Sequence, residues 1–247
     1  MTVWVVLPTY NEAANLERMI AALLALELGV RVVIVDDDSP DGTGEIADRL
    51  AAARPEVRVI HRAGERGLGT AYLAGFRHAL AAGATAVLTM DCDFSHDPAV
   101  VPNLAAALAG ADLVIGSRYV PGGGIRNWPI HRRWLSRMAN RFVRLLFHLP
   151  AADCTSGFRL YRRHLLEAIP WEHIRSSGYS FLVETLYWAA RQPGTRIREV
   201  PICFTDRVRG KSKLGLREAV CGAGHLLRLR FSVRGRPGAT EERPGGG

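Results

Sequence analysis

The chain has 247 residues, of which 48% are hydrophobic, so it can bury a sizeable core, and its length suits one large domain. Its formal charge is +8, from 32 Lys and Arg against 24 Asp and Glu, which points to an anionic ligand or surface. The four cysteines have neither a CxxC spacing nor the density of a disulfide framework, which argues against a zinc site and against a disulfide-stabilised fold.

The N-terminus gives no signal for export. It begins with an apolar, strand-like segment at 3–7 in place of a basic leader and a cleavage site. No apolar run approaches the roughly 18 residues that a membrane-spanning helix needs. We therefore expect a cytoplasmic protein that meets a membrane only peripherally, on its cytoplasmic face, either directly or through a membrane-anchoring partner protein.

Short β-branched runs alternate with Ala-, Leu- and Arg-rich helical patterns through the first half of the chain. Strands are predicted at 4–7, 32–35, 57–60, 86–90 and 112–116, and helices at about 13–26, 42–53, 70–82 and 98–109. Asp97 is expected to cap the last of these helices, with Pro98 in its first position. This alternation predicts an α/β, Rossmann-like fold with a mainly parallel central sheet.

The pattern changes after Ser117. We predict a Gly/Pro turn at 121–124, an amphipathic helix at about 131–147, a helix near 180–191, a strand at 196–200, a basic amphipathic helix at 214–231 and a disordered tail at 232–247.

Three of the predicted strands end in acidic segments. Pro8 to Glu12 follow the first strand, Asp36 to Gly42 the second, and Asp91 to Asp93 the fourth. Ligands of open parallel sheets bind at the carboxyl ends of the strands, so these segments are expected to converge on one site. Carboxylates at one edge repel each other unless a cation offsets them, and hard oxygen ligands favour Mg²⁺ or Mn²⁺.

Each polar segment also has a structural interpretation. A lone DxD is more often a turn or a helix cap, although its position after a buried strand favours a ligand role for Asp91 and Asp93. The segment from Asp36 to Asp41 can equally be a solvated turn that opens a helix. Gly64 to Gly69 match neither a Walker loop nor a dinucleotide fingerprint, so we interpret them as a structural turn.

Seven arginines and no Asp or Glu lie between Leu113 and Ala152. A guanidinium group matches phosphate oxygens and keeps its charge, so phosphate-binding candidates are Arg118, Arg132, Arg207 and Lys213. For four others, Arg126, Arg137, Arg141 and Arg144, a solvated helix face is an equally good interpretation.

The helix at 131–147 has one apolar face flanked by arginines. Its apolar residues are Trp134, Leu135, Met138, Phe142, Leu145 and Leu146. This pattern is typical of a helix that lies in a membrane interface, and the alternative is a core helix beneath an arginine-covered surface. We expect the neighbouring Trp128 to be exposed and to contact lipid.

Taken in order, these segments resemble the polyprenol- and dolichol-phosphate mannosyltransferases, inverting enzymes with the GT-A nucleotide-sugar-binding fold. The resemblance runs from about residue 3 to residue 230 and rests on PTYNE, VDDDSPDGT, RGLGTAY, MDCDFSH, GSRYVPGGGIRNWP, RRWLSR, TSGFRLY and FTDRVRGKSKL. It implies a single GT-A catalytic domain at 1–213 whose helix at 131–147 faces the acceptor and the membrane. It also implies that mannose passes from GDP-mannose to a polyprenyl phosphate with inversion.

The same resemblance assigns roles to individual residues. The nucleotide sugar is expected to contact Pro8, Tyr10, Glu12, Val35, Asp37, Asp91, Cys92, Asp93, Arg207 and Lys213. Mg²⁺ or Mn²⁺ is expected on Asp91, Asp93 and Ser95, the acceptor phosphate on Arg118, Arg132 and Ser156, and the catalytic roles on Asp93, Arg118 and Arg132. The sequence departs from the usual pattern at Cys92, where alanine is common, and at Ser95, where glutamine is common, which leaves the choice of metal open.

Two alternatives stay open beside this one. The first keeps the acceptor and changes the donor to UDP-glucose. The second is a basic nucleic-acid-binding protein, which a pI near 9.8 and the arginine-rich segments suggest. Carboxylates at three strand ends have no role in such a protein, so we expect no nucleic-acid partner. A nucleotidyltransferase is disfavoured because the segment after the first strand is not a Gly-rich, Lys-bearing loop.

Overall fold

A computed structural model describes residues 1–206 apart from 65, 175 and 177. The helix predicted at 214–231, the tail at 232–247 and two predicted site residues, Arg207 and Lys213, lie outside this part of the chain.

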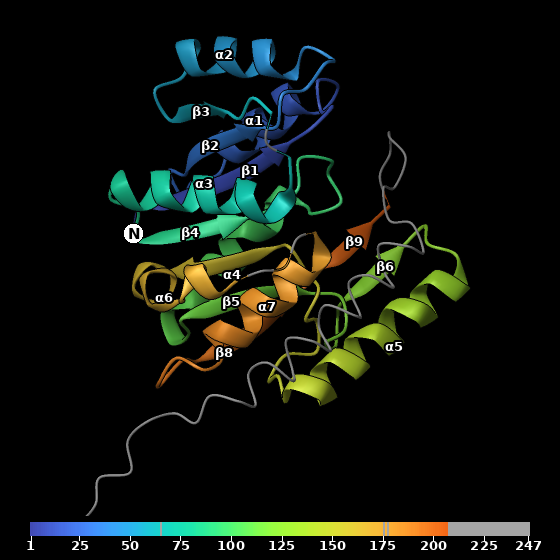
Figure 1. Cartoon of the computed structure of the whole chain (residues 1–247). Coiled ribbons are helices and arrows are strands. Elements are labelled where there is room, and N and C mark those ends of the chain that lie inside the picture. Colours follow the sequence, from blue (N-terminus) through green and yellow to red (C-terminus); the bar gives the residue numbers. More distant parts are fainter. Residues whose placement is uncertain (65, 175, 177, 207–247) are drawn as a thin grey trace, which may run out of the picture.

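The fold is built on a seven-stranded sheet in the order β3-β2-β1-β4-β7-β5-β8 (Figure 1). Its strands are β1 (Val3–Thr9), β2 (Arg31–Asp36), β3 (Val57–His61), β4 (Ala86–Thr89), β5 (Leu113–Ser117), β7 (Arg159–Arg162) and β8 (Ile197–Pro201). All neighbours pair in parallel except β7, which runs antiparallel to both β4 and β5. The predicted mainly parallel sheet is confirmed, and all five strands expected in the first half are present.

A second, two-stranded parallel sheet stands beside the main one. It pairs β6 (Gly124–Arg126) with β9 (Cys203–Thr205). Neither strand is predicted from the sequence, and the Gly/Pro turn expected at 121–124 covers the residues just before β6 and its first residue. β9 therefore lies beside β6, the strand that follows β5 and precedes the predicted interfacial helix in the sequence.

The helices predicted within the described residues are confirmed within a few residues. They are α1 (Leu16–Leu24), α2 (Thr43–Ala53), α3 (Leu68–Ala81), α4 (Val101–Ala107), α5 (Ile130–Phe147), α6 (Arg163–Ala168) and α7 (Tyr179–Ala189). Short 3-10 turns flank α4, and the first begins at Pro98 behind the expected cap, where the Asp97 carboxylate accepts a hydrogen bond from the Ala99 amide at 2.9 Å. The short helix α6 was not predicted.

Alternate residues of β1 point to two separate hydrophobic cores, as a sheet covered on both faces requires. Val3, Val5 and Leu7 pack in the core that contains α1 and α4 residues, whereas Trp4 and Val6 pack in the core that contains α3 and α7 residues. A methyl group added to Gly75 of α3 would lie 2.2 Å from a methyl carbon of Val6, so this close contact requires glycine. The two layers fix the strand ends, where the site lies.

Candidate active site at the carboxyl edge of the sheet

Acidic side chains from two strand ends lie together at one edge of the sheet. β1 and β4 are adjacent and parallel, so the segments that follow them meet. Between Asp91 and Asp93 lies Cys92, whose side chain is buried in the core. Burial raises the pKa of the Cys92 thiol well above its ordinary value, and the nearby charges of Glu12, Asp93 and Asp91 raise it further. The predicted convergence of these carboxylates is present in the structure.

The two aspartates after β4 differ in exposure. The Asp91 side chain is 33% exposed, whereas Asp93 is buried and accepts a hydrogen bond from the Ser95 amide at 2.9 Å. The Ser95 hydroxyl is also buried, and it has no hydrogen-bond partner among the described residues. A buried polar atom without a partner is costly, so this hydroxyl suits a ligand that the protein chain does not supply.

These oxygens suit a divalent cation whose remaining ligands come from a substrate. Within the described residues, no group of three or more His, Cys, Asp and Glu side chains could hold a metal ion. A cation bound by Asp91 and Asp93, with or without Ser95, would therefore need further oxygen ligands. Mg²⁺ is typically bound in this manner, through one or two carboxylates together with substrate phosphates.

Asp37, which follows β2, binds another part of the protein. Its carboxylate accepts hydrogen bonds from the guanidinium group of Arg62 and, at 3.0 Å, from the Gly67 amide. Gly67 has a φ of 146° and directly precedes α3, so this contact positions the start of that helix. The structural turn predicted there is confirmed. The nucleoside contact expected of Asp37 stays a prediction, and this ion pair constrains it.

The neighbouring acidic residues of this segment form a turn. Asp36 accepts hydrogen bonds from Thr9 and from the Ser39 hydroxyl, the latter at 2.6 Å. Asp41 accepts from the Thr43 amide and hydroxyl at the beginning of α2. Burial tends to raise the pKa of Asp41, but its hydrogen bonds to Thr43 and Ala13 bring the pKa below the ordinary value. The helix-opening interpretation holds for Asp41.

The remaining predicted nucleotide contacts divide into surface and core residues. Pro8, Tyr10 and Glu12 are partly exposed, and the guanidinium carbon of Arg66 lies 4.8 Å from the centroid of the Tyr10 ring. Val35, like the thiol of Cys92, is buried in a hydrophobic core. The side chain of Val35 therefore packs inside the protein, and only its backbone remains as a direct contact.

Arg118 stands at the end of β5, on the same edge of the sheet as Asp91. Its guanidinium group donates two 2.7 Å hydrogen bonds to the carboxylate of Asp153, and its amide donates a third. Asp153 is fully buried. Burial tends to raise its pKa, but the charge and hydrogen bonds of Arg118 bring the pKa below the ordinary value. This ion pair fixes Arg118 beside the site and offsets much of its charge.

Ser156 was expected to contact the acceptor phosphate, and its geometry does not favour that role. The residue is 2% exposed, and its hydroxyl donates a 2.7 Å hydrogen bond to the carbonyl of Gly116 in β5. It therefore joins its loop to the sheet.

The expectation for Trp128 was wrong. Its side chain is 8% exposed and packs edge-on against Phe204, with ring centroids 5.5 Å apart. The guanidinium carbon of Arg132 lies 3.9 Å from the Trp128 ring centroid, and Arg132 also pairs with Asp206 at 3.3 Å. Trp128 thus supports the predicted acceptor residue Arg132 and does not form a lipid contact.

Phe204 of β9 connects the acidic edge with the arginines. Its ring lies 5.5 Å from the ring of His96 and 5.5 Å from the guanidinium carbon of Arg118. The next amide, that of Thr205, donates a 3.4 Å hydrogen bond to the carbonyl of Ser95. The two charged regions are therefore neighbours, although a chain segment of more than a hundred residues separates Ser95 from β9.

Two residues of the site were missed by the sequence analysis. His96 is buried, stacks on Phe158 with ring centroids 5.0 Å apart, and accepts the Asp91 amide hydrogen through Nδ1 at 3.2 Å. It holds the backbone of the acidic segment, and the only signal for it was its place in MDCDFSH. Phe204 carried no signal, because its importance depends on contacts with distant residues.

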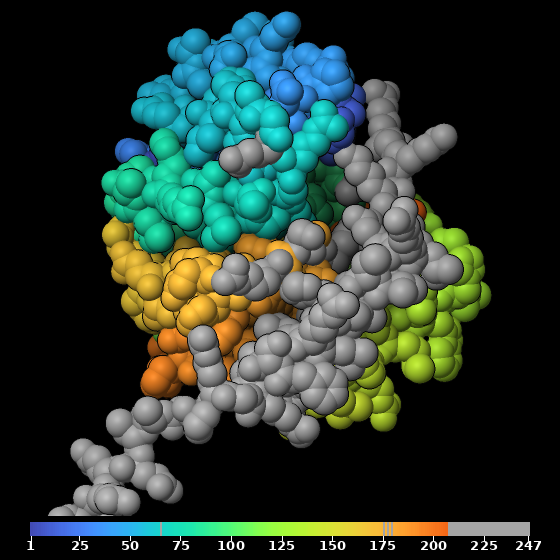
Figure 2. Space-filling view, viewed as in Figure 1, coloured from blue at the N-terminus to red at the C-terminus, as the bar shows by residue number. Residues whose placement is uncertain are grey.

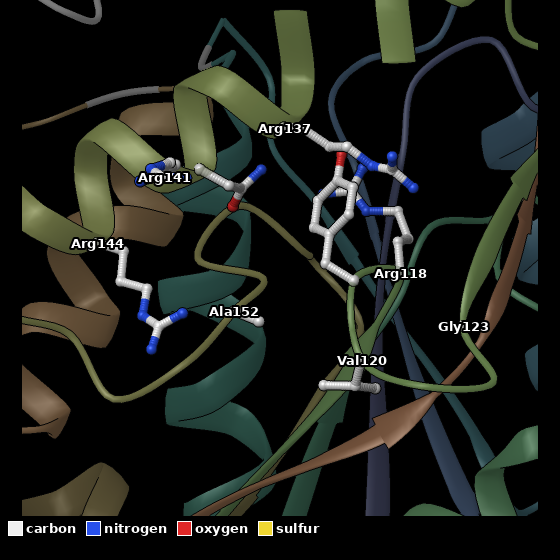
Figure 3. Close-up of a pocket in the computed structure, with 9 residues that line it drawn as sticks. Arg118, Val120, Gly123, Arg137, Arg141, Arg144 and Ala152 are labelled. Atoms are coloured by element: carbon white, nitrogen blue, oxygen red, sulfur yellow. The ribbon is translucent and has the colours of Figure 1, made fainter. Parts of the chain in front are cut away.

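A cavity of about 330 Å³ lies between the end of β5 and α5 (Figure 3). It is lined by Arg118, Tyr119, Val120, Gly123, Arg137, Asn140, Arg141, Arg144 and Ala152. Figure 3 shows Arg137, Arg141 and Arg144 on successive turns of α5, with Arg118 on the strand side of the cavity. A solvated helix face and a ligand contact are equally good interpretations of these three α5 arginines from the sequence, and the structure places them around a cavity.

The outer face of α5 is apolar and exposed. Ile130, Trp134, Leu135, Met138, Phe142 and Leu145 have between 49% and 76% of their surface exposed, and we call this set the α5 ridge. Its opposite face packs on the protein through Asn140, Val143 and Phe147. The alternative of a core helix is therefore wrong for the ridge, although Leu146 does pack against the core. Figure 2 shows α5, in yellow-green, forming one flank of the molecule.

Within the part of the chain that the structure describes, no helix is both long enough and apolar enough to cross a membrane.

The model of the glycosyl transferase family 2 matches residues 4–169, and the chain belongs to that family. It is a glycosyltransferase. Two relatives are similar to this chain over most of its length. A polyprenol monophosphomannose synthase of Mycolicibacterium smegmatis is 47% identical over 94% of this chain and 87% of its own length. An undecaprenyl-phosphate mannosyltransferase of Micrococcus luteus is 45% identical over 87% of this chain and 88% of its own. The resemblance drawn from the motifs is confirmed.

Solved structures confirm the GT-A fold. A glucosyl-3-phosphoglycerate synthase from Mycobacterium tuberculosis, in complex with Mn²⁺, UDP and glucosyl-3-phosphoglycerate, aligns with a TM-score of 0.63 at 23% identity over 96% of this chain and 81% of its own. A mannosyltransferase from Pyrobaculum calidifontis in complex with GDP-mannose and Mn²⁺ aligns with a TM-score of 0.60 at 20% identity, over 96% of this chain and 65% of its own.

Proposed function

We propose that this enzyme transfers mannose from GDP-mannose to a polyprenyl phosphate and inverts the configuration at the anomeric carbon. The observation that carries the proposal is a juxtaposition. An acidic edge lies next to arginines that border an exposed apolar helix, and Phe204 contacts both sides. A nucleotide sugar and a lipid phosphate would need these two environments side by side. The names of the two relatives supply the sugar and the class of acceptor.

On the donor side, we assign Asp91 and Asp93 to a divalent cation, Mg²⁺ or Mn²⁺, with Ser95 as a further ligand. The support is the buried Ser95 hydroxyl without a partner among the described residues, together with the carboxylates at the end of β4. When bound, such a cation neutralises charge that develops on the departing diphosphate. Pro8, Tyr10, Glu12 and Asp37 line the same edge and are assigned to the nucleoside.

On the acceptor side, we assign the phosphate to Arg118 and Arg132. A phosphate monoester has a second pKa of about 6, so it is largely dianionic at neutral pH and needs little help from a general base. In the proposed step, one of its oxygens bonds to the anomeric carbon while the bond to the nucleoside diphosphate breaks on the opposite face. Arginines that position the acceptor for this displacement would suffice.

The proposed acceptor is a lipid, so we propose that the enzyme works at the surface of a membrane, on its cytoplasmic face. The α5 ridge supports this location, because an exposed apolar helix face next to arginines is typical of interfacial helices. A membrane-anchoring partner protein is compatible with the same arrangement. Nucleic acid is not among the proposed partners.

The direct test uses purified full-length protein with polyprenyl phosphate in detergent and either Mg²⁺ or Mn²⁺. Radiolabelled GDP-mannose and UDP-glucose are supplied in parallel, and label is counted in the lipid extract. The proposal expects metal-dependent label from GDP-mannose. Label from UDP-glucose alone would show that the donor is UDP-glucose and not GDP-mannose. No lipid product from either donor, also with membranes added, would remove polyprenyl phosphate as the acceptor.

A further inference from the structure

The segment that joins β3 to α3 is held at both of its ends by one carboxylate. Asp37 accepts a 2.7 Å hydrogen bond from the Arg62 guanidinium group, directly after β3, and a 3.0 Å hydrogen bond from the Gly67 amide, directly before α3. The Arg62 guanidinium group also donates to the Gly67 carbonyl at 3.2 Å. The Arg62 and Asp37 side chains are almost completely buried. Arg66, which precedes Gly67, therefore leaves the backbone next to a fixed point.

The Arg66 side chain lies at the end of β1, although Arg66 belongs to the segment after β3. It is exposed, and its guanidinium carbon is 4.8 Å from the centroid of the Tyr10 ring. Within the part of the chain that the structure describes, no Asp or Glu side chain forms an ion pair with Arg66. A charged hydrogen-bond donor thus stands beside an aromatic ring at the carboxyl edge of the sheet, where ligands bind.

Tyr10 and the acidic segment after β4 are close enough to contact one nucleotide. The strands β3, β2, β1 and β4 are neighbours in this order, and Tyr10 directly follows β1 (Figure 1). Neighbouring strands lie about 4.8 Å apart, so one or two spacings correspond to roughly 5–10 Å. A base beside Tyr10 and a diphosphate at the end of β4 can therefore belong to the same ligand.

The pair of Tyr10 and Arg66 can discriminate between bases. An aromatic ring stacks on every base, so Tyr10 alone would give affinity without selection. A guanidinium group matches two adjacent acceptors, and guanine presents two of them, O6 and N7, on one edge. Adenine presents an acceptor beside an amino donor on that edge, and uracil presents a single carbonyl oxygen. Only guanine can accept both hydrogen bonds from Arg66.

We propose that Arg66 selects guanine in the nucleotide donor. The base stacks on Tyr10, and the Arg66 guanidinium group moves from the ring to donate hydrogen bonds to O6 and N7. The move gives up only a cation–π contact at an exposed site, which is weak. Asp37 acts through the backbone, because it holds the segment that carries Arg66. This inference rests on the proposed function for the GDP group, and it adds the residue that separates GDP from other nucleotides.

The test removes the same contact from the protein and from the ligand. Calorimetric titrations of the full-length protein with Mn²⁺ use GDP, UDP and 7-deazaguanosine diphosphate, which lacks the N7 acceptor. The unmodified protein should bind the 7-deaza ligand about tenfold less tightly than GDP. Arg66→Ala should bind GDP at least about tenfold less tightly than the unmodified protein, and it should bind GDP and the 7-deaza ligand equally.

Arg191→Ala is the matched control. The guanidinium carbon of Arg191 lies 3.7 Å from the Tyr187 ring centroid, so the variant removes the same type of contact from the region after α7. It should keep the GDP affinity and the preference for N7, and thermal unfolding checks that both variants are folded. A preference for N7 that survives in Arg66→Ala, or an equal loss in both variants, would overturn the role of Arg66 and leave GDP as the donor. Binding of UDP in preference to GDP by the unmodified protein would contradict the donor itself and the inference with it.

Discussion

The acidic edge and the arginine-rich region differ in how the fold assembles them. Asp91 and Asp93 owe their position to one strand, β4, and to its parallel neighbour β1. The arginines owe theirs to partners that lie far away in the sequence, because Asp153 holds Arg118 and Asp206 pairs with Arg132. The positions of the carboxylates therefore follow from the order of the parallel strands, whereas the position of each of these arginines depends on its ion-pair partner.

The comparison also explains why counting arginines is a poor guide to ligand binding. Arg62 and Arg159 are buried and hold Asp37 and two backbone carbonyls, respectively. Arg118 is almost as buried and is paired as well. Arg137, Arg141 and Arg144 have no such partner among the described residues. The arginines of this chain thus range from structural groups to charges that a ligand can use.

The largest effect is expected at the acidic edge. Asp93→Asn keeps the hydrogen bond that the Ser95 amide donates to the side-chain oxygen but removes the negative charge, so the fold should survive while metal binding fails. We expect a loss of about 10³-fold in kcat, which is roughly 4 kcal/mol of transition-state stabilisation. Steady-state kinetics with Mg²⁺ or Mn²⁺ measure it. Full turnover in this variant would exclude the metal role of Asp93.

In the arginine-rich region the largest expected effect is on stability. Asp153→Asn leaves the buried guanidinium group of Arg118 without its counter-charge, which should lower the free energy of unfolding by about 3 kcal/mol. Denaturant unfolding measures this change. Glu17→Gln is the control, because it breaks the exposed pair with Arg49 and should cost less than about 0.5 kcal/mol. Similar losses in both variants would contradict the role of the buried pair.

A smaller effect is expected from Arg132→Ala. Arg132 is partly exposed and lies over Trp128, so its removal should leave the fold intact and remove one contact to the acceptor phosphate. The KM for polyprenyl phosphate should rise about tenfold, roughly 1.4 kcal/mol, with little change in the KM for GDP-mannose. A selective rise in the KM for the donor would instead move Arg132 to the nucleotide.

The smallest expected effect is on the pH dependence of the free energy of unfolding under acidic conditions. The pKa of Asp153 is lower in the folded protein than its ordinary value of about 3.9, so the unfolded chain takes up this proton first. The stabilisation is fully present above the ordinary pKa and is lost as the pH falls through the folded pKa. Its slope is at most about 1.4 kcal/mol per pH unit. Unfolding between pH 5 and pH 3 should be less pH-dependent in Asp153→Asn, and identical slopes would contradict this.

Sequence patterns predicted the features that depend on local order along the chain. The five strands of the first half, the cap at Asp97 and the acidic segments after β1 and β4 all follow from periodicity and from the position of polar residues after apolar runs. The amphipathic pattern of α5 likewise predicted its exposed apolar face.

What the sequence could not predict depends on contacts between distant residues. β7 was missed because RLYR is short and begins with Arg159, whose charge suggests a surface residue although it is fully buried. Trp128 was expected on the surface because its partner, Phe204, lies in a strand that pairs only after the chain has folded. The structural role of Ser156 also depends on a distant residue, because its hydroxyl donates a hydrogen bond to the carbonyl of Gly116 in β5.

We propose that the acidic edge binds the donor while the arginines bind the acceptor. Calorimetric titration of GDP into the full-length protein with Mn²⁺ tests it, using the unmodified chain, Asp93→Asn and Arg132→Ala. We expect that Asp93→Asn loses the metal-dependent binding and that Arg132→Ala binds GDP as the unmodified protein does. Binding that survives in Asp93→Asn, or that fails in both variants, would contradict the division of the site.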